Sequence, residues 1–206
     1  MLAPSLNRFD CIAPFYDRLS TLVFGNSLIN AQKCNLHIVQ AHAEVLVLGG
    51  GTGKWLIELL KHNKTCKIWY VEASLKMIHL ARRHLNATDQ VVFIHGTQYN
   101  IPHRKFDIVI THFFVDMFSE TDLSDLTEQI ARVLKKEGKW IVADFVNNKY
   151  WHKLFLWLMY FFFNTIGALN HKTLPDWDRI IQSKSFALVN ETPFYKGFIK
   201  NIIYAR

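Results

Sequence analysis

Residues 45–53 constrain the fold of this chain most strongly, because a run of β-forming residues leads directly into a cluster of glycines. Residues 45–48 read Val-Leu-Val-Leu, and the next five read Gly-Gly-Gly-Thr-Gly. Apolar pairs at 55–56 and 59–60 then favour an amphipathic helix. We therefore predict a buried parallel strand, a tight turn and a helix that packs back onto the sheet. Glycine lets such a turn take positive φ and lets a ligand approach the backbone closely. The start of a helix also offers unpaired N–H groups to a ligand, so this unit predicts a nucleotide-type binding site.

The spacing of the glycines narrows the kind of nucleotide. A dinucleotide fingerprint, G-x-G-x-x-G, would need a third glycine where Lys54 or Leu56 stands. The phosphate-binding pattern G-x-x-x-x-G-K-[ST] would need its first glycine in place of Leu48. The pattern that remains is G-x-G-x-G, at Gly49, Gly51 and Gly53.

Further strand and helix segments follow in alternation. Residues 67–72 form a strand-like run that ends in Glu72, whose carboxylate could accept both hydroxyls of a ribose, and Ser74 can cap the next helix. That helix presents Leu75, Ile78, Ala81 and Leu85 on one face. Later strands are predicted at 91–96, 108–112, 140–145, 187–190 and 198–204, with residues 132–138 as the turn before the strand at 140.

Together these segments resemble the class I S-adenosylmethionine-dependent methyltransferases. The resemblance implies an α/β fold, a doubly wound, mostly parallel seven-stranded sheet, with S-adenosylmethionine as the cofactor. It places the methionine part of the cofactor at the glycine turn and the ribose at Glu72. The cofactor-binding residues that it implies are Tyr16, Gly49, Gly50, Gly51, Thr52, Gly53, Glu72, Ala73, Met77, Gly96, Thr97, Gln98 and His112.

The N-terminal segment points to a subgroup. Residues 9–19, with Phe24 and Gly25 further on, are similar to the F-D-x-I-A-x-x-Y-D-x-L opening of the menaquinone and ubiquinone biosynthesis C-methyltransferases and their relatives. The resemblance makes Tyr16 a residue that covers the cofactor; an aromatic plug between an N-terminal helix and the sheet is the alternative. Two positions depart from the family pattern, since Val47 and Thr97 stand where acids are usual.

Residues 150–169 are unusually apolar, and the sixteen residues from 154 to 169 carry no charge. A single membrane crossing there would separate the last strands from the sheet that they complete, so we predict a helical lid in two pieces instead. Gly167 with Asn170 gives one break, Pro175 gives a second, and Trp177 then begins a short helix. Packing in the core or in a homodimer, and contact with a membrane surface, are the alternatives for this segment.

The lid bears on the acceptor of the methyl group. We expect Trp151, Tyr160 and Phe161 to line an apolar pocket next to His112, which favours a small lipophilic acceptor such as a quinone-like, aromatic or lipid metabolite. A base is needed only if the acceptor loses a proton, and His112 is the candidate, with a polar wall residue as its alternative. An RNA or protein methyltransferase, a dehydrogenase and a non-catalytic cofactor-binding domain remain open.

Composition favours one intracellular domain. The 206 residues predict a single domain, with residues 1–40 as a helical cover and residues 147–185 as the lid. No secretory signal pattern precedes the first strand, and three widely spaced cysteines suit a cytoplasmic protein. The net charge of +7 is scattered rather than gathered into a stripe, so we do not expect a nucleic acid partner. The ten histidines fall in no metal-binding pattern, so we expect no metal.

Overall fold

Seven strands form one sheet in a computed structural model that describes residues 21–85, 88–153, 155–156 and 174–206. Its order is β3-β2-β1-β4-β5-β7-β6, and only β7 runs antiparallel to its neighbours. The strands are β1 (Glu44–Leu48), β2 (Lys67–Glu72), β3 (Val91–His95), β4 (Phe106–His112), β5 (Leu134–Phe145), β6 (Ala187–Phe194) and β7 (Ile199–Ala205). The predicted mostly parallel, seven-stranded sheet is confirmed.

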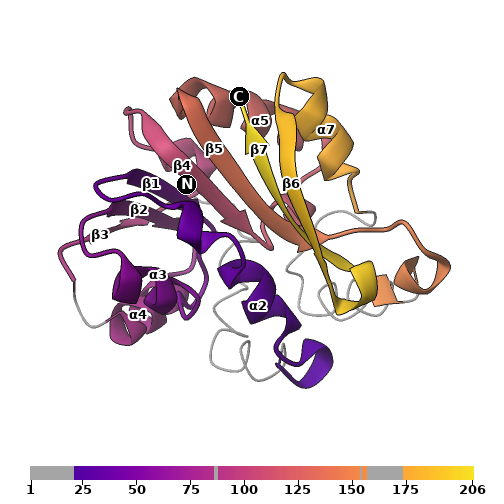
Figure 1. Cartoon of the computed structure of the whole chain (residues 1–206), viewed down its shortest axis with the longest axis horizontal. Helices are drawn as coiled ribbons and strands as arrows, with labels where there is room; N and C mark the ends of the chain where they lie inside the picture. The colour runs from indigo at the N-terminus through magenta and orange to yellow at the C-terminus, as the bar shows by residue number, and fades with distance from the viewer. Residues whose placement is uncertain (1–20, 86–87, 154, 157–173) are drawn as a thin grey trace.

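Helices cover both faces of the sheet (Figure 1). The α-helices are α2 (Ser27–Lys33), α3 (Leu56–His62), α4 (Leu75–His84), α5 (Glu120–Val133) and α7 (Trp177–Ser183). Short 3-10 helices are η2 (Leu36–Ile38), η3 (Gln98–Asn100), η4 (Val115–Met117) and η5 (Tyr195–Gly197). Leu46 and Leu48 of β1 pack in the core beneath α5 and α7, whereas Val45 and Val47 pack in the core beneath α3 and α4. The strand is thus buried on both sides, as its uninterrupted apolar run predicts.

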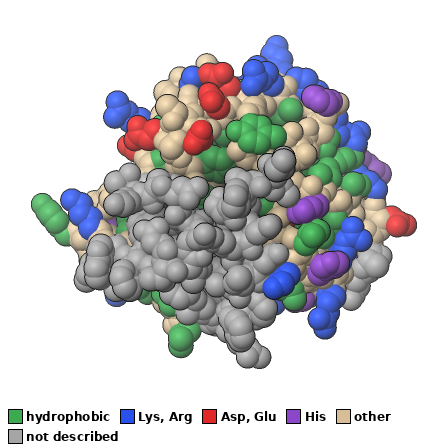
Figure 2. Space-filling model, turned by 180° about the vertical axis from the view of Figure 1, so that it is seen from behind, with side chains coloured by type: hydrophobic (Ala, Val, Ile, Leu, Met, Phe, Trp, Pro, Cys, Tyr) green, Lys and Arg blue, Asp and Glu red, His purple; other side chains and the backbone are tan. Residues whose placement is uncertain are grey.

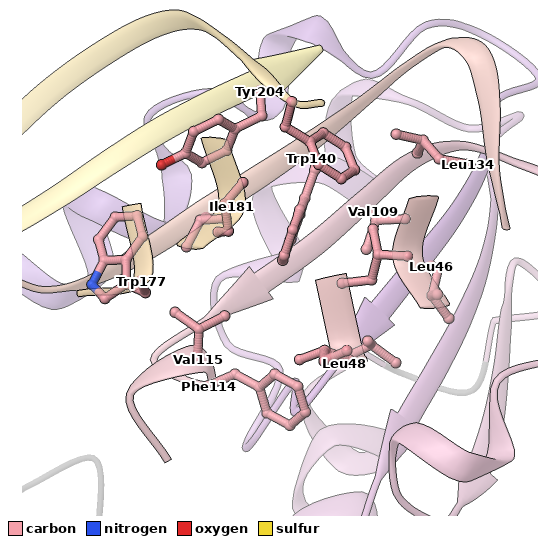
Figure 3. Packing of buried hydrophobic residues seen from close by; sticks show 14 of the residues in the cluster. Leu46, Leu48, Val109, Phe114, Val115, Leu134, Trp140, Trp177, Ile181 and Tyr204 are labelled. Atoms are coloured by element: carbon pink, nitrogen blue, oxygen red, sulfur yellow. The ribbon is translucent and has the colours of Figure 1, made fainter. Parts of the chain in front are cut away.

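The core beneath α5 and α7 is rich in aromatic rings (Figure 3). Trp140 packs with its ring edge toward Phe186, and its Nε1 donates to the Thr111 hydroxyl at 2.9 Å. Trp177 begins α7, as predicted, and its Nε1 donates to the Phe145 carbonyl at 2.7 Å. Each buried indole N–H therefore has an acceptor, which lets these large rings be buried without a desolvation penalty.

Two details differ from the predictions. Strand β5 begins at Leu134 rather than at Trp140, because α5 ends directly into extended backbone; the pairing passes from Phe106–Leu134 to Ile108–Lys139, so the extra residues form a bulge. In α4, Leu75 is 48% exposed and does not belong to the buried face. It occupies the first helical position, just after the Ser74 cap, and Met77 is buried in its place.

Part of the predicted lid and cover falls outside the described residues. Residues 150–153 and 155–156 are helical, but Tyr16, Tyr160 and Phe161 are not among the residues that the structure describes. Within the described ranges, none of the helices combines the length and the apolar composition that crossing a bilayer requires.

Candidate functional site

The glycine turn between β1 and α3 adopts the backbone that only glycine takes readily. Gly49, Gly51 and Gly53 have φ values of +65°, +63° and +69°. A Cβ on Gly49 would lie 2.3 Å from the Phe114 ring, whereas a Cβ on Gly51 would meet no atom of the described residues within 4 Å. As far as those residues show, Gly51 borders open space at the carboxyl edge of the sheet, which fits a ligand lying against its backbone.

Two side chains, Tyr70 of β2 and Trp55 just before α3, hold this turn in place. The Tyr70 hydroxyl donates to the Gly51 carbonyl at 2.9 Å, and Trp55 Nε1 donates to the Gly50 carbonyl at 3.3 Å. The Tyr70 ring also fills the space where a Cβ of Gly50 would lie, only 2.1 Å from its Cζ. These contacts fix the backbone N–H groups of the turn before any ligand binds, which lowers the entropic cost of binding.

Glu72, at the tip of β2, reaches the same turn. Its Oε2 accepts from the Gly51 N–H and its Oε1 accepts from the Ser74 N–H, each at 2.9 Å. The residue is only 9% exposed. These bonds hold the carboxylate beside Gly51, next to the position that the resemblance assigns to the ribose. Glu72 and Gly51 therefore fit the cofactor that the sequence implies, and Ala73 follows directly at the strand end.

The residues after β3 form hydrogen bonds within their own turn. The Thr97 N–H donates to Asn100 Oδ1 at 2.9 Å, and the Thr97 hydroxyl accepts from the Tyr99 N–H. A Cβ on Gly96 would lie 2.4 Å from Asn100 Oδ1, so glycine is required there by packing. Gln98 begins η3, and Met77 is buried within α4. Among these residues, Gly96, Thr97 and Gln98 lie at the carboxyl edge of the sheet, beside the end of β2.

His112 ends β4 and is 4% exposed. Its ring stands edge-on to Trp55 at a centroid distance of 4.7 Å, and neither ring nitrogen has a hydrogen-bond partner among the described residues. Burial lowers the pKa of His112 from 6.5 to about 3. The ring is therefore neutral near pH 7 and a weak proton acceptor, which fits a wall residue better than a catalytic base.

Two carboxyl groups that the sequence reasoning did not single out lie at the same edge. Asp144 is fully buried in β5, and its Oδ2 accepts from the N–H groups of Phe114, Val115 and Asp116 at 3.0, 3.0 and 3.3 Å. Its Oδ1 accepts from the Phe145 N–H at 2.8 Å. Asp116 lies in η4, four residues after β4, and Asp144 lies near the end of the neighbouring parallel strand β5. Acids that follow or end two neighbouring parallel strands were the sequence signal that could have indicated this pair.

Aromatic side chains gather beyond the ends of β4 and β5. Phe113 follows His112 and lies 5.1 Å from the Phe145 ring between centroids. Trp151, which is 36% exposed, lies 5.6 Å from Phe198 and 6.2 Å from Phe155. This aromatic cluster is made up of Phe24, Phe113, Phe145, Trp151, Phe155, Tyr195 and Phe198.

Comparison with known proteins agrees with this geometry. Residues 45–138 match the family described as methyltransferase domain, a span that holds the glycine turn, Glu72 and η4. The chain contains a methyltransferase domain. The match confirms the class I resemblance, while it does not reach the N-terminal segment on which the quinone-enzyme resemblance depends. No curated protein matches the sequence.

Solved structures share the fold of this methyltransferase at low sequence identity. A Haloferax volcanii chain solved in complex with the Trm112 methyltransferase activator has a TM-score of 0.74 and 15% identity, over 97% of each chain. An O-methyltransferase family protein from Burkholderia thailandensis has a TM-score of 0.72 and 17% identity, over 96% of this chain and 59% of that one. Human N-acetylserotonin methyltransferase, solved with S-adenosylmethionine, has a TM-score of 0.66 and 17% identity, over 99% of this chain and 60% of that one. The methyltransferase spans about three fifths of the latter two chains.

Proposed function

We propose that this methyltransferase acts on a small lipophilic acceptor, such as a quinone-like or other aromatic metabolite, rather than on RNA or protein. The observation that carries the proposal is the aromatic cluster at the carboxyl edge of the sheet. Ligands of open α/β sheets bind at that edge. Four rings of the cluster are at least partly exposed, namely Phe113, Trp151, Phe155 and Tyr195. Such rings favour a flat apolar molecule, because RNA or an extended peptide would need a polar, open groove.

The aromatic cluster is connected to the glycine turn through a chain of contacts. Phe113 directly follows His112, whose ring contacts Trp55, and the Trp55 indole bonds the glycine turn. Phe113 in turn contacts Phe145, and Phe145 contacts Phe198 at 5.2 Å between centroids. An acceptor that lies on Phe113 would therefore also lie next to the cofactor.

Two proteins with similar folds support a small-molecule acceptor. One belongs to an O-methyltransferase family protein and the other to N-acetylserotonin methyltransferase. Among the described residues, in contrast, Lys and Arg side chains stand at separate places around the rim of one face and form no single basic patch (Figure 2). That distribution gives little support to a phosphate backbone as the acceptor.

The chain contributes to methyl transfer mainly by positioning the cofactor and the acceptor and by excluding water. When bound, S-adenosylmethionine supplies a methyl group that its sulfonium charge already activates. The glycine turn and Glu72 would hold the cofactor, and the aromatic cluster would align the acceptor and keep water out. Alignment of this kind contributes on the order of 7–11 kcal/mol to lowering a barrier.

Calorimetry and methyl-transfer assays test the proposal. We expect S-adenosylmethionine and S-adenosylhomocysteine to bind and NAD not to bind, and radiolabelled methyl groups to reach a reduced naphthoquinone or a naphthol rather than RNA or a peptide. Phe155→Ala should raise the KM for the acceptor and leave the cofactor Kd unchanged, while Phe155→Leu, which keeps apolar bulk, should change either value less. Label found only in RNA or peptide would contradict the proposal.

A further inference from the structure

We propose that Asp116 takes the proton from the hydroxyl group of the acceptor during methyl transfer, with Asp144 as its positioning residue. This inference rests on the proposed function, and it adds that the acceptor carries an ionisable hydroxyl group. It depends on where η4 lies, on how Asp144 holds it, and on the chemistry of two neighbouring buried carboxyl groups.

The segment that carries Asp116 packs against the glycine turn. It follows β4 at the carboxyl edge of the sheet, where η4 spans Val115–Met117. Phe114, just before it, packs so closely on Gly49 that a Cβ there would lie 2.3 Å from the ring. Figure 3 shows Phe114 and Val115 next to Leu48, at the end of β1 where the turn begins. Asp116 is therefore two residues from a direct contact with the turn.

Asp144 fixes the position of this segment. Its Oδ2 receives the consecutive N–H groups of Phe114, Val115 and Asp116, and its Oδ1 receives the N–H of Phe145. Four donors on one carboxylate stabilise its ionised form and leave the backbone of η4 little freedom. Asp144 is fully buried, so it positions Asp116 and does not itself face an acceptor.

The two carboxyl groups influence each other. Burial raises the pKa of Asp116 to about 7, and burial together with Asp116 raises the pKa of Asp144. Two carboxylates this close do not both ionise readily, so the pair releases its second proton only near neutral pH. Because Asp144 receives the backbone donors, that proton is carried by Asp116. The Asp144 carboxyl group faces Asp116.

A carboxyl group in this state suits proton transfer near neutral pH. In its ionised form, an Asp116 oxygen forms a bond to the hydroxyl proton of the acceptor, while the electron pair of the broken O–H bond stays on the acceptor oxygen. That oxygen is then the nucleophile for the methyl group. A base whose pKa is near the working pH accelerates such a step by about 10²–10⁴-fold. His112, with a pKa of about 3, does not compete for this proton.

The test uses 4-nitrophenol, which is coloured only as the phenolate, bound together with S-adenosylhomocysteine at about pH 8. In the native protein, ionised Asp116 beside the bound phenol oxygen should raise the pKa of the probe by about 1–3 pH units. Binding should therefore take up a proton and remove the phenolate absorbance. In Asp116→Asn the bound probe should stay coloured. The matched control is Asp125→Asn, the same change at an exposed position of α5, which should behave like the native protein.

The outcomes separate this inference from the proposed function. If the native protein and Asp116→Asn bind the probe with the same change in absorbance, Asp116 is not the proton acceptor, and the proposed function stands. If S-adenosylhomocysteine binds but the phenol does not bind to any variant, the proposed acceptor class is wrong and the inference falls with it. A difference confined to Asp116→Asn supports both.

Discussion

At the scale of single residues, the glycine turn is held by side chains that also face the ligand space. Glu72 bonds the N–H of Gly51, and the Tyr70 hydroxyl bonds the carbonyl of the same residue. Val47 stands where the family usually has an acid, and it is fully packed between Tyr70 of β2 and Ile110 of β4. The polar side-chain contacts of Gly51 therefore come from β2 rather than from β1.

Replacing Glu72 tests this assignment. Glu72→Ala should weaken the binding of S-adenosylhomocysteine by about 1.5–3 kcal/mol, because hydrogen bonds to a charged acceptor are the strong ones. Glu72→Gln keeps one oxygen acceptor and should lose less. Calorimetry measures both, with Glu137→Ala, at an exposed acid in the bulge of β5, as the control. Unchanged affinity in Glu72→Ala would remove Glu72 from the binding site.

At the scale of elements, α7 docks through one face. Ile181 is fully buried in the core that α7 shares with Trp140 and Tyr204, whereas its neighbour Ile180 is only partly buried. The Trp177 indole anchors the start of the helix to the carbonyl of Phe145. Since β5 ends at Phe145, this helix also supports the strand that carries Asp144.

The two adjacent isoleucines give a matched pair of substitutions. Ile181→Ala should lower the free energy of unfolding by about 2–5 kcal/mol, because it opens a cavity that packed neighbours cannot close. Ile180→Ala removes the same atoms from a partly exposed position and should cost clearly less. Urea unfolding followed by circular dichroism compares them. Equal losses would show that α7 does not pack as described.

At the scale of the whole molecule, two buried groups give the stability opposite dependences on pH. Folding lowers the pKa of His112 from 6.5 to about 3, so stability is lost as the pH falls below about 6.5. Folding raises the pKa of Asp116 from 3.8 to about 7, so stability is lost as the pH rises toward 7. Each effect has a slope of about 1.4 kcal/mol per pH unit where one proton is exchanged, and the two slopes have opposite signs.

Single substitutions should uncover the two slopes. Between about pH 5 and pH 6.5, the stability of His112→Phe should fall more steeply with rising pH than that of the native protein. The stability of Asp116→Asn should fall less steeply than that of the native protein, or rise, over the same interval. Urea unfolding at several pH values measures the three curves, and parallel curves for all three proteins would mean that neither group carries its shifted pKa.

The sequence alone determined the parts of this protein that depend on local pattern. Strand burial, turn geometry and helix capping are set by residues close in the chain. The sequence therefore predicted the buried strand, the positive-φ glycines, the Ser74 cap and the acid that ends β2. The start of β5 was not readable, because its pairing with β4 across a bulge decided it.

Only the tertiary structure decided what the side chains at the sheet edge can do. Asp116 and Asp144 are 28 residues apart in the chain, and they meet because β4 and β5 are neighbours in the sheet. His112 looked like a base by position, but burial beside Trp55 lowers its pKa, while burial raises that of Asp116. A pKa depends on the groups and the solvent around a side chain, and the folded chain brings these together from segments that no local pattern connects.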